Sequence, residues 1–174
     1  MIAVAVVGSK KSGKTKTVEA LVRGLTKRGY RVATAKHVSE QDFTVDTEGK
    51  DTWLHAQAGA KTIVVVAPKE LVTIRKVDTR SLTLQEVVQI CENGIDVIVF
   101  EGFRSLVERE RAVLKIVAVK DMQEIINASK QFDPIIAFTG PVVLSAKLRV
   151  PIVDVLKKPR EIAAIVEKHL GNFE

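Results

Sequence analysis

The chain of 174 residues contains little cysteine, few aromatic side chains and no long apolar run. Its single cysteine, Cys91, excludes an internal disulfide and any zinc site built from several cysteines. Cys91 lies among apolar residues of an expected helix, which favours a packed thiol over a nucleophile. No apolar run approaches the roughly 18 residues of a membrane span, and no signal peptide precedes the first strand. These absences predict a soluble, cytoplasmic protein that does not associate with membranes.

The charge balance favours an anionic ligand. The formal net charge is +6, from 27 Lys and Arg against 21 Asp and Glu. Such an excess suits nucleic acid, an anionic lipid or a phosphorylated ligand. The basic residues are spread along the chain, without the interleaved aromatic residues of single-stranded nucleic-acid binders. We therefore expect a solvated basic surface around one anionic ligand site, and no nucleic-acid partner.

Short apolar runs alternate with amphipathic segments. We expect strands at 2–7, 31–35, 63–67, 71–77, 95–100, 114–119, 134–138 and 152–153. Helices are expected at 15–27, near 54–58, and at 82–92, 122–128 and 159–169. Only residues 68–70 separate the strands at 63–67 and 71–77, so these two form an antiparallel hairpin. The remaining alternation predicts one α/β domain over residues 1–174 with a mostly parallel sheet.

The segment 8–15, GSKKSGKT, matches the P-loop pattern G-x-x-x-x-G-K-[ST] at every fixed position. It follows a buried strand and opens an amphipathic helix, which is the context that this motif requires. Backbone N–H groups and the helix N-terminus would hold phosphate oxygens. Lys14 would reach the terminal phosphates, and the Thr15 hydroxyl would ligate Mg²⁺. Lys10 and Lys11 either contact phosphate or remain solvated. The motif predicts a three-layer αβα fold of the P-loop NTPase type.

A carboxylate at a strand end usually completes such a site. Glu101 ends the apolar strand at 95–100, at the sheet edge where α/β proteins bind ligands. Asp96 begins the same strand at the opposite edge, and we interpret it as structural.

Four motifs in order resemble one family. They are GSKKSGKT, Lys36-His37, the segment 45–52 (VDTEGKDT) and Glu101-Gly102-Phe103-Arg104. Together they are similar to those of the molybdopterin-guanine dinucleotide biosynthesis adaptor protein B (MobB) family. The resemblance is clear through about Val119 and looser beyond it. Two departures stand out: this chain has no further histidines shortly after His37, and Arg104 replaces the lysine that commonly follows the Glu-Gly-Phe motif.

The resemblance implies a GTP-binding adaptor with weak GTPase activity that requires Mg²⁺ and forms a homodimer. It implies a supporting role to the molybdenum cofactor guanylyltransferase, which attaches GMP to molybdopterin, with molybdopterin-dependent apoenzymes as a further class of partner. Asp46 and Glu101 become candidate catalytic residues, and Thr15, Asp46 and Glu101 candidate metal ligands. The predicted nucleotide-binding residues are Gly8, Ser9, Lys10, Lys11, Ser12, Gly13, Lys14, Thr15, Thr17, Lys36 and His37.

Simpler interpretations remain open for several of these residues. His37 could end its strand without binding anything, and the segment around Asp46, Lys50 and Asp51 could be a solvated turn. The guanine preference rests on the resemblance, because no Asn-Lys-x-Asp signature is present and the segment 145–147 (SAK) is a weak match to a guanine-proximal motif. The alternative functions are a small-metabolite kinase using ATP, with a lid drawn from Arg104 to Arg111, and a scaffold that binds no nucleotide.

Overall fold

The computed structural model describes residues 1–91, 94–142 and 148–170, and the chain divides into two compact units. The first unit is formed by Met1–His37 and Thr83–Glu174, and the second by Val38–Leu82. A single domain over the whole chain stays a prediction.

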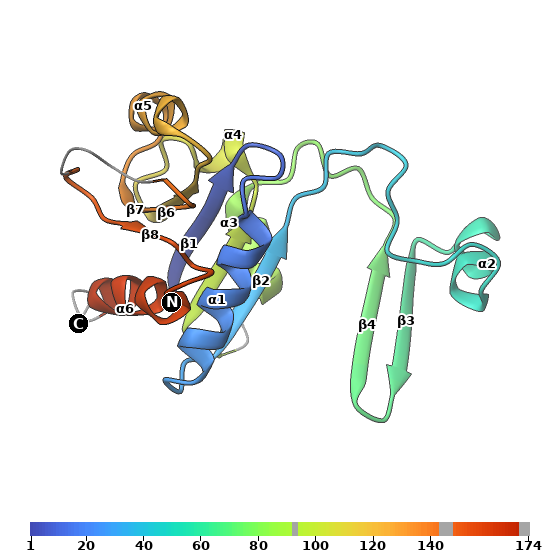
Figure 1. Ribbon diagram of the computed structural model, residues 1–174. Coiled ribbons are helices and arrows are strands. Elements are labelled where there is room, and N and C mark those ends of the chain that lie inside the picture. Colours follow the sequence, from blue (N-terminus) through green and yellow to red (C-terminus); the bar gives the residue numbers. More distant parts are fainter. Residues whose placement is uncertain (92–93, 143–147, 171–174) are drawn as a thin grey trace. The chain divides into compact units, whose positions relative to one another are not determined.

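The first unit is built on a six-stranded parallel sheet (Figure 1). Its strands are β1 (Ile2–Gly8), β2 (Val32–Lys36), β5 (Val97–Glu101), β6 (Val113–Ala118), β7 (Ile135–Thr139) and β8 (Ile152–Val153), in the order β2-β5-β1-β6-β7-β8. The central strands are buried on both faces, as parallel sheets between helices require. The sheet confirms the predicted α/β class.

The strand order places β5 directly beside β1, and β2 lies beyond β5 at the edge of the sheet. The pairing runs from Ile2 opposite Val97 to Val6 opposite Glu101. β2 pairs with the outer edge of β5, where Lys36 lies opposite Glu101. β5 is apolar from Val97 to Phe100, whereas β2 contains Thr34 and Lys36, so β5 is better suited to the central position. This order brings the end of β5 next to the loop that follows β1.

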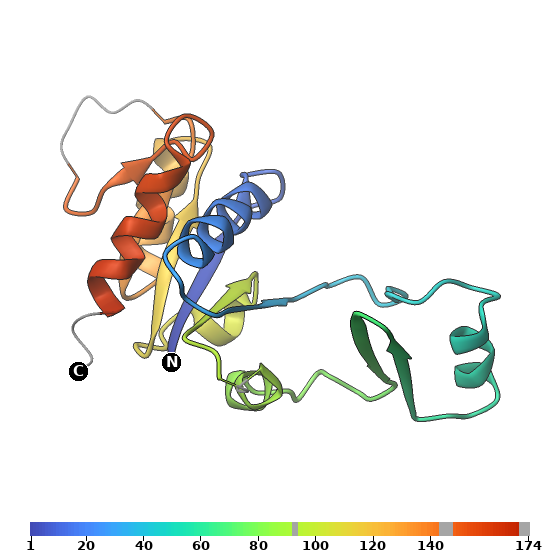
Figure 2. The same ribbon diagram turned by 90° about the horizontal axis from the view of Figure 1, so that it is seen from below.

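Two helices cover one face of the sheet. α1 (Lys14–Thr26) and α6 (Pro159–Leu170) pack side by side there, as Figures 1 and 2 show. Leu21 and Leu25 of α1 and Ile162 of α6 are fully buried against alternate residues of the central strands. Gly24 permits the close approach, because a Cβ at this position would lie 2.5 Å from the Cβ of Ala163. This packing fixes the direction in which α1 leaves β1.

The remaining helices of this unit are α3 (Leu84–Cys91), α4 (Arg104–Val107) and α5 (Met122–Gln131). α3 begins with a reciprocal cap, in which Thr83 and Glu86 exchange hydrogen bonds between side chains and backbone N–H groups. α5 begins at Asp121, whose carboxylate accepts from the backbone N–H of Glu124 at 2.9 Å. Burial raises the pKa of the Cys91 thiol, which agrees with a packed residue and not an activated nucleophile.

The amino edge of the sheet is held by ion pairs and buried polar groups. Asp96 accepts hydrogen bonds from the backbone and guanidinium of Arg31, which lower its pKa to about 2. Lys115 is fully buried in β6 and donates to the backbone carbonyls of Glu110 and Asp133. These contacts support the structural interpretation of Asp96.

The second unit contains a helix and a hairpin. α2 (Asp51–Gln57) precedes β3 (Thr62–Ala67) and β4 (Glu70–Arg75), which pair antiparallel from Thr62 opposite Arg75 to Ala67 opposite Glu70. The two-residue turn Pro68-Lys69 therefore confirms the predicted hairpin. Within the described part of the chain, no helix combines the length and apolar character needed to cross a membrane.

Candidate phosphate-binding site

The loop between β1 and α1 has the backbone of a phosphate cradle. Gly8 has a φ of 150°, and a Cβ there would lie 2.3 Å from the carbonyl oxygen of Ala118 on β6. Lys11 and Gly13 also have positive φ values, of 62° and 95°, and Gly13 caps α1. Such a path turns successive N–H groups toward one point at the helix N-terminus, where the helix dipole also attracts anions.

Lys14 lies across this loop. Its Nζ donates to the carbonyl oxygens of Gly8 at 3.1 Å and Ser9 at 2.7 Å. Burial lowers the pKa of Lys14, and the cations Lys36 and Arg104 lower it further, whereas Glu101 and Glu124 oppose the shift. The ammonium is thus held at the mouth of the loop among both positive and negative groups.

Thr15 and Glu101 meet beside Lys14. The Thr15 hydroxyl donates to Glu101 Oε1 at 3.0 Å, and Lys36 Nζ lies 3.6 Å from the same oxygen. The Glu101 side chain is only 14% exposed, whereas that of Lys36 is 61% exposed. The structure therefore brings together four predicted site residues, Lys14, Thr15, Lys36 and Glu101, from three elements.

The residues after Glu101 form a strained turn that holds the strand end in place. Gly102 and Phe103 both have positive φ values, of 88° and 54°. The Phe103 ring is buried against Phe100 at 5.2 Å and lies 5.5 Å from the His37 ring. A bulky residue in the left-handed region is unusual and tends to occur at functional sites. His37 contributes its backbone N–H to Glu101 O at 3.0 Å, so its observed contacts are structural.

Two further contacts tie the loop to the sheet and to α5. Ser9 Oγ donates to Glu124 Oε1 at 2.7 Å, and Glu124 Oε2 accepts from the backbone N–H of Lys120 at 2.8 Å. Burial would raise the pKa of Glu124, but these hydrogen bonds outweigh it and the pKa is lowered. On the other side, the hydroxyls of Thr17 and Thr139 lie 2.9 Å apart and are buried. The loop is therefore tied to α5, and the helix that follows the loop is tied to β7.

Asp46, the other predicted carboxylate, belongs to the second unit. Its Oδ1 accepts from the backbone N–H of Thr47 at 2.9 Å and from the Thr52 hydroxyl at 2.7 Å. Its Oδ2 is buried and has no hydrogen-bond partner among the described residues. Asp46 thus orders the turn before α2, and its role in catalysis or metal binding stays a prediction.

The donor set fits Mg²⁺ held jointly with a triphosphate. Within residues 1–91, 94–142 and 148–170, no group of three or more His, Cys, Asp or Glu could hold a metal ion by itself. A hydroxyl and a carboxylate do meet at the loop, through Thr15 and Glu101. Mg²⁺ is commonly bound by one or two protein oxygens together with substrate phosphates, so these residues suit it.

Arg109 and Arg111, two arginines of the predicted lid segment, make their contacts away from the phosphate loop. Arg109 donates to the Lys130 carbonyl at 2.6 Å, and Arg111 pairs with Asp133 at 3.1 Å. Arg111 and Asp133 precede β6 and β7, at the sheet edge opposite the phosphate loop. Arg104 instead donates to Gln131 and lies 5.4 Å from the centre of the Phe132 ring. A kinase-type lid over the phosphates finds no support in Arg109 and Arg111.

Sequence reasoning missed three residues around the loop: Glu124, Thr139 and Asp154. Glu124 could have been noticed from the spacing of Asp121 and Glu124, since an acidic cap followed three residues later by Glu marks a helix start. Nothing in the sequence joins that start to Ser9. The segment 145–147, the weak guanine-proximal match, lies outside the described residues.

Comparison with known families identifies this arrangement. The model of "Molybdopterin guanine dinucleotide synthesis protein B" matches residues 3–139. The chain belongs to the MobB family. This P-loop NTPase family is the one that the sequence motifs predicted, and its phosphate loop implies nucleotide binding.

Individual relatives of MobB type agree. A molybdopterin-guanine dinucleotide biosynthesis adapter protein of Haemophilus influenzae is 33% identical over 100 residues, which are 57% of this chain and 55% of that protein. A protein of Methanocaldococcus jannaschii, provisionally assigned the same role, is 32% identical over 122 residues, or 70% of this chain and 48% of that one. The chain thus spans about half the length of the curated relatives it matches.

Solved MobB structures share the fold. A crystal structure of molybdopterin-guanine biosynthesis protein B superimposes with a TM-score of 0.72 at 22% identity, covering 97% of this chain and 99% of that one. A MobB homolog from Bacillus stearothermophilus gives a TM-score of 0.70 at 22% identity, with 97% of both chains covered. The parallel sheet with an antiparallel hairpin is therefore a MobB-like fold.

Proposed function

We propose that the protein is a GTP-binding adapter in molybdopterin-guanine dinucleotide biosynthesis, assisting the guanylyltransferase that attaches GMP to molybdopterin. One observation supports nucleotide binding above others: the Thr15 hydroxyl lies 3.0 Å from Glu101 Oε1 at the mouth of an intact P-loop. The adapter role is supported by the names of the Haemophilus influenzae and Methanocaldococcus jannaschii relatives.

In this proposal the phosphates lie on the loop 8–15, with Lys14 turned from the carbonyls of Gly8 and Ser9 toward phosphate oxygens. Lys10 and Lys11 are exposed and add positive potential there. Lys36, beside Glu101, contributes charge at the same end. Thr15 and Glu101 would hold Mg²⁺, which neutralises charge on the terminal phosphates when bound.

Hydrolysis by this site should be slow. Fast P-loop hydrolases place an arginine against the transferred phosphoryl group. Arg104 lies near Lys14 but is engaged with Gln131 and the Phe132 ring. Arg109 is bonded to the Lys130 carbonyl, and Arg111 lies at the opposite sheet edge. Glu101 is the carboxylate of the first unit placed to orient water, and Asp46 is our candidate from the second unit. We therefore propose weak GTPase activity secondary to binding.

Titration calorimetry with GTP and ATP, followed by a phosphate-release assay, tests this function. We expect Mg²⁺-dependent binding of GTP and turnover far below one per second. Rapid ATP hydrolysis without GTP binding would overturn the proposal.

Replacing Glu101 by Gln should weaken triphosphate binding in Mg²⁺ by about 10- to 100-fold, the usual loss when a carboxylate supporting a metal is removed. Because the loss arises from weaker support of Mg²⁺ by the neutral amide, it should vanish when EDTA removes the metal. Calorimetry in both buffers measures it. Glu167→Gln, which alters a partly exposed carboxylate of α6, is the matched control. Equal affinities for wild type and Glu101→Gln in Mg²⁺ would exclude the metal role.

We also propose a homodimer through the hairpin of the second unit. Val64, Val66 and Leu71 are 56%, 79% and 70% exposed, and Val66 pairs with Leu71 across the two strands. An exposed apolar cluster on a two-stranded sheet favours association. Light scattering at micromolar concentration should show a dimer, and the double variant Val66→Lys, Leu71→Lys should be monomeric. A monomeric wild type would contradict this part of the proposal.

A further inference from the structure

A small cavity adjoins the phosphate loop on the side away from Glu101. It has a volume of about 110 Å³ and is lined by Ser12 and Gly13 of the loop, Thr139 and Pro141 after β7, and Asp154 and Leu156 after β8. Because β5 and β7 lie on opposite sides of β1, Glu101 and this cavity flank the loop from opposite directions. All these residues belong to the first unit.

The cavity wall is closely packed, and one of its lining residues has an unsatisfied polar atom. Gly140 allows the end of β7 to pass close to β6, since a Cβ there would lie 2.0 Å from the Val119 carbonyl oxygen. The hydroxyls of Thr17 and Thr139 join this wall to α1. Ser12 is 7% exposed, and its buried Oγ has no hydrogen-bond partner among the described residues. Such a hydroxyl is rare in proteins, and a ligand or an ordered water that reaches the loop would satisfy it.

The direction of a bound nucleotide follows from the loop. Its terminal phosphates belong beside Lys14, Thr15 and Glu101, where the cations and the metal-binding oxygens gather. The nucleoside must then leave the loop on the other side, toward Ser12 and the cavity. Pro141, Val155 and Leu156 provide apolar surface there for a flat base.

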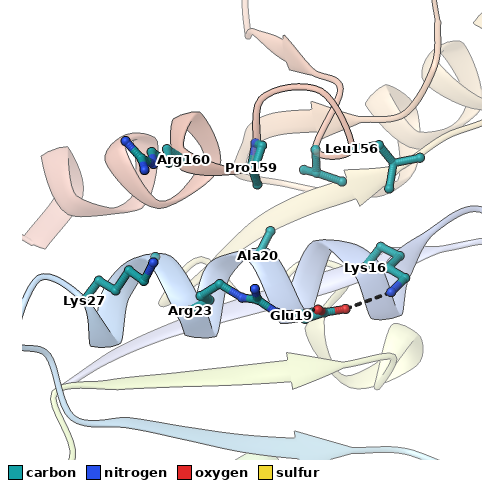
Figure 3. A pocket seen from close by; sticks show the side chains of 10 residues that line it. Lys16, Glu19, Ala20, Arg23, Lys27, Leu156, Pro159 and Arg160 are labelled. Carbon is teal, nitrogen blue, oxygen red and sulfur yellow. Dashed lines mark hydrogen bonds and ion pairs between the residues drawn. The ribbon is translucent and has the colours of Figure 1, made fainter.

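A larger groove adjoins the cavity and adds space for a base. The cavity shares the lining residues Lys16, Val155 and Leu156 with a groove of about 420 Å³ between α1 and the start of α6. Figure 3 shows Lys16 and Leu156 at one end of this groove, with Arg23, Lys27 and Arg160 farther along it.

Asp154 is the carboxylate among the described residues that line the cavity. Its Oδ1 accepts from the backbone N–H groups of Leu156 at 3.1 Å and Lys157 at 3.4 Å, which fix its orientation. Its Oδ2 pairs with the exposed ammonium of Lys157 at 3.3 Å, a contact that a bound base would replace. Burial would raise the pKa of Asp154, but these bonds and Lys157 lower it, so the group is ionised at neutral pH. An ionised carboxylate accepts hydrogen bonds only, at up to about four lone-pair positions.

We propose that Asp154 selects guanine, by accepting hydrogen bonds from N1–H and the 2-amino group of a base lying against Pro141 and Leu156. The inference rests on the proposed GTP binding and supplies the base recognition that the sequence leaves open. Guanine presents two adjacent donors on this edge. Adenine presents an unprotonated N1, which would face the carboxylate with one lone pair against another, and such a mismatch is a strong source of discrimination.

Exchange of the acceptor for a donor tests the assignment. Asp154→Asn should weaken GTP binding at least about tenfold and strengthen binding of xanthosine triphosphate by a similar factor. The first change reflects the loss, and the second the gain, of one good hydrogen-bonded contact to the base. A carboxylate that only ordered the turn before α6 would give no gain for xanthosine triphosphate. Asp121→Asn, the same change at the cap of α5, should leave base preference unaltered.

A second measurement needs no variant. Wild type should bind GTP at least tenfold more tightly than inosine triphosphate, which lacks the 2-amino group, and more tightly than ATP. Equal binding of GTP, inosine triphosphate and ATP by wild type, or an unchanged GTP preference in Asp154→Asn, would overturn the inference while leaving triphosphate binding intact. A wild type that binds no triphosphate would overturn the proposed function as well.

Discussion

Replacing Lys14 by Ala should lower the affinity for GTP about a hundredfold. Lys14 is the partly buried cation of the loop, with its Nζ within 3.1 Å of two loop carbonyls and close to Glu101 and Glu124. Removing one partner of a desolvated charged contact typically costs about 2–5 kcal/mol, and about 1.4 kcal/mol is one decade in affinity. Calorimetry with Mg²⁺ and GTP measures the change.

The control for Lys14→Ala is Lys168→Ala, which removes an equal charge from the exposed last turn of α6. Its affinity for GTP should stay near that of wild type. If Lys14→Ala and Lys168→Ala bound GTP equally well, the nucleotide would lie somewhere other than on this loop, and the scaffold alternative would return.

Replacing Gly8 by Ala should destabilise the first unit by about 3 kcal/mol and abolish binding. A Cβ at Gly8 would lie 2.3 Å from the Ala118 carbonyl oxygen and 2.6 Å from Ser12 Oγ, and the φ of 150° is unfavourable for alanine. Overpacking against a central strand costs about 1–3 kcal/mol, and the backbone conformation adds about 1–2 kcal/mol. Urea denaturation followed by circular dichroism measures the loss.

Gly29→Ala separates these two causes. Gly29 has a φ of 90°, but no atom lies within 4 Å of the position of its added Cβ. Its alanine variant should therefore lose only the backbone contribution, about 1 kcal/mol. Similar losses at Gly8 and Gly29 would show that close packing of the loop against β6 contributes little.

Much of the first unit could be predicted because local signals determine it. The apolar run 2–7, the P-loop pattern and the amphipathic helix after it are contiguous, so strand, loop and helix follow from neighbouring residues. The hairpin follows equally from two β-rich runs and a short turn. The four ordered motifs predicted the MobB family, which the family comparison confirms.

The strand order was not predictable in this way. The sequence predicts strands at 2–7 and 31–35 with a helix between them, but nothing in it indicates that β5 lies between these two strands in the sheet. Which strand occupies the centre depends on burial on both faces, a property of the assembled sheet. Only this order brings Glu101 next to Thr15 and Lys36.

Contacts across long sequence distances escaped prediction for the same reason. Ser9 and Glu124 are 115 residues apart, and Thr17 and Thr139 are 122 apart. Each residue looks ordinary in its own segment, as a loop serine, a helix-start glutamate or a strand-end threonine. Asp154 likewise looks like a turn former, and only the cavity beside Ser12 makes it a candidate for reading the base.

The most direct measurement is the rate at which the molybdenum cofactor guanylyltransferase forms molybdopterin-guanine dinucleotide from molybdopterin and GTP, with and without this protein. If the protein is a nucleotide-binding adapter acting through its P-loop, wild type should raise the rate at limiting GTP, and Lys14→Ala should not. An equal rate with wild type, with Lys14→Ala and with no added protein would contradict that function.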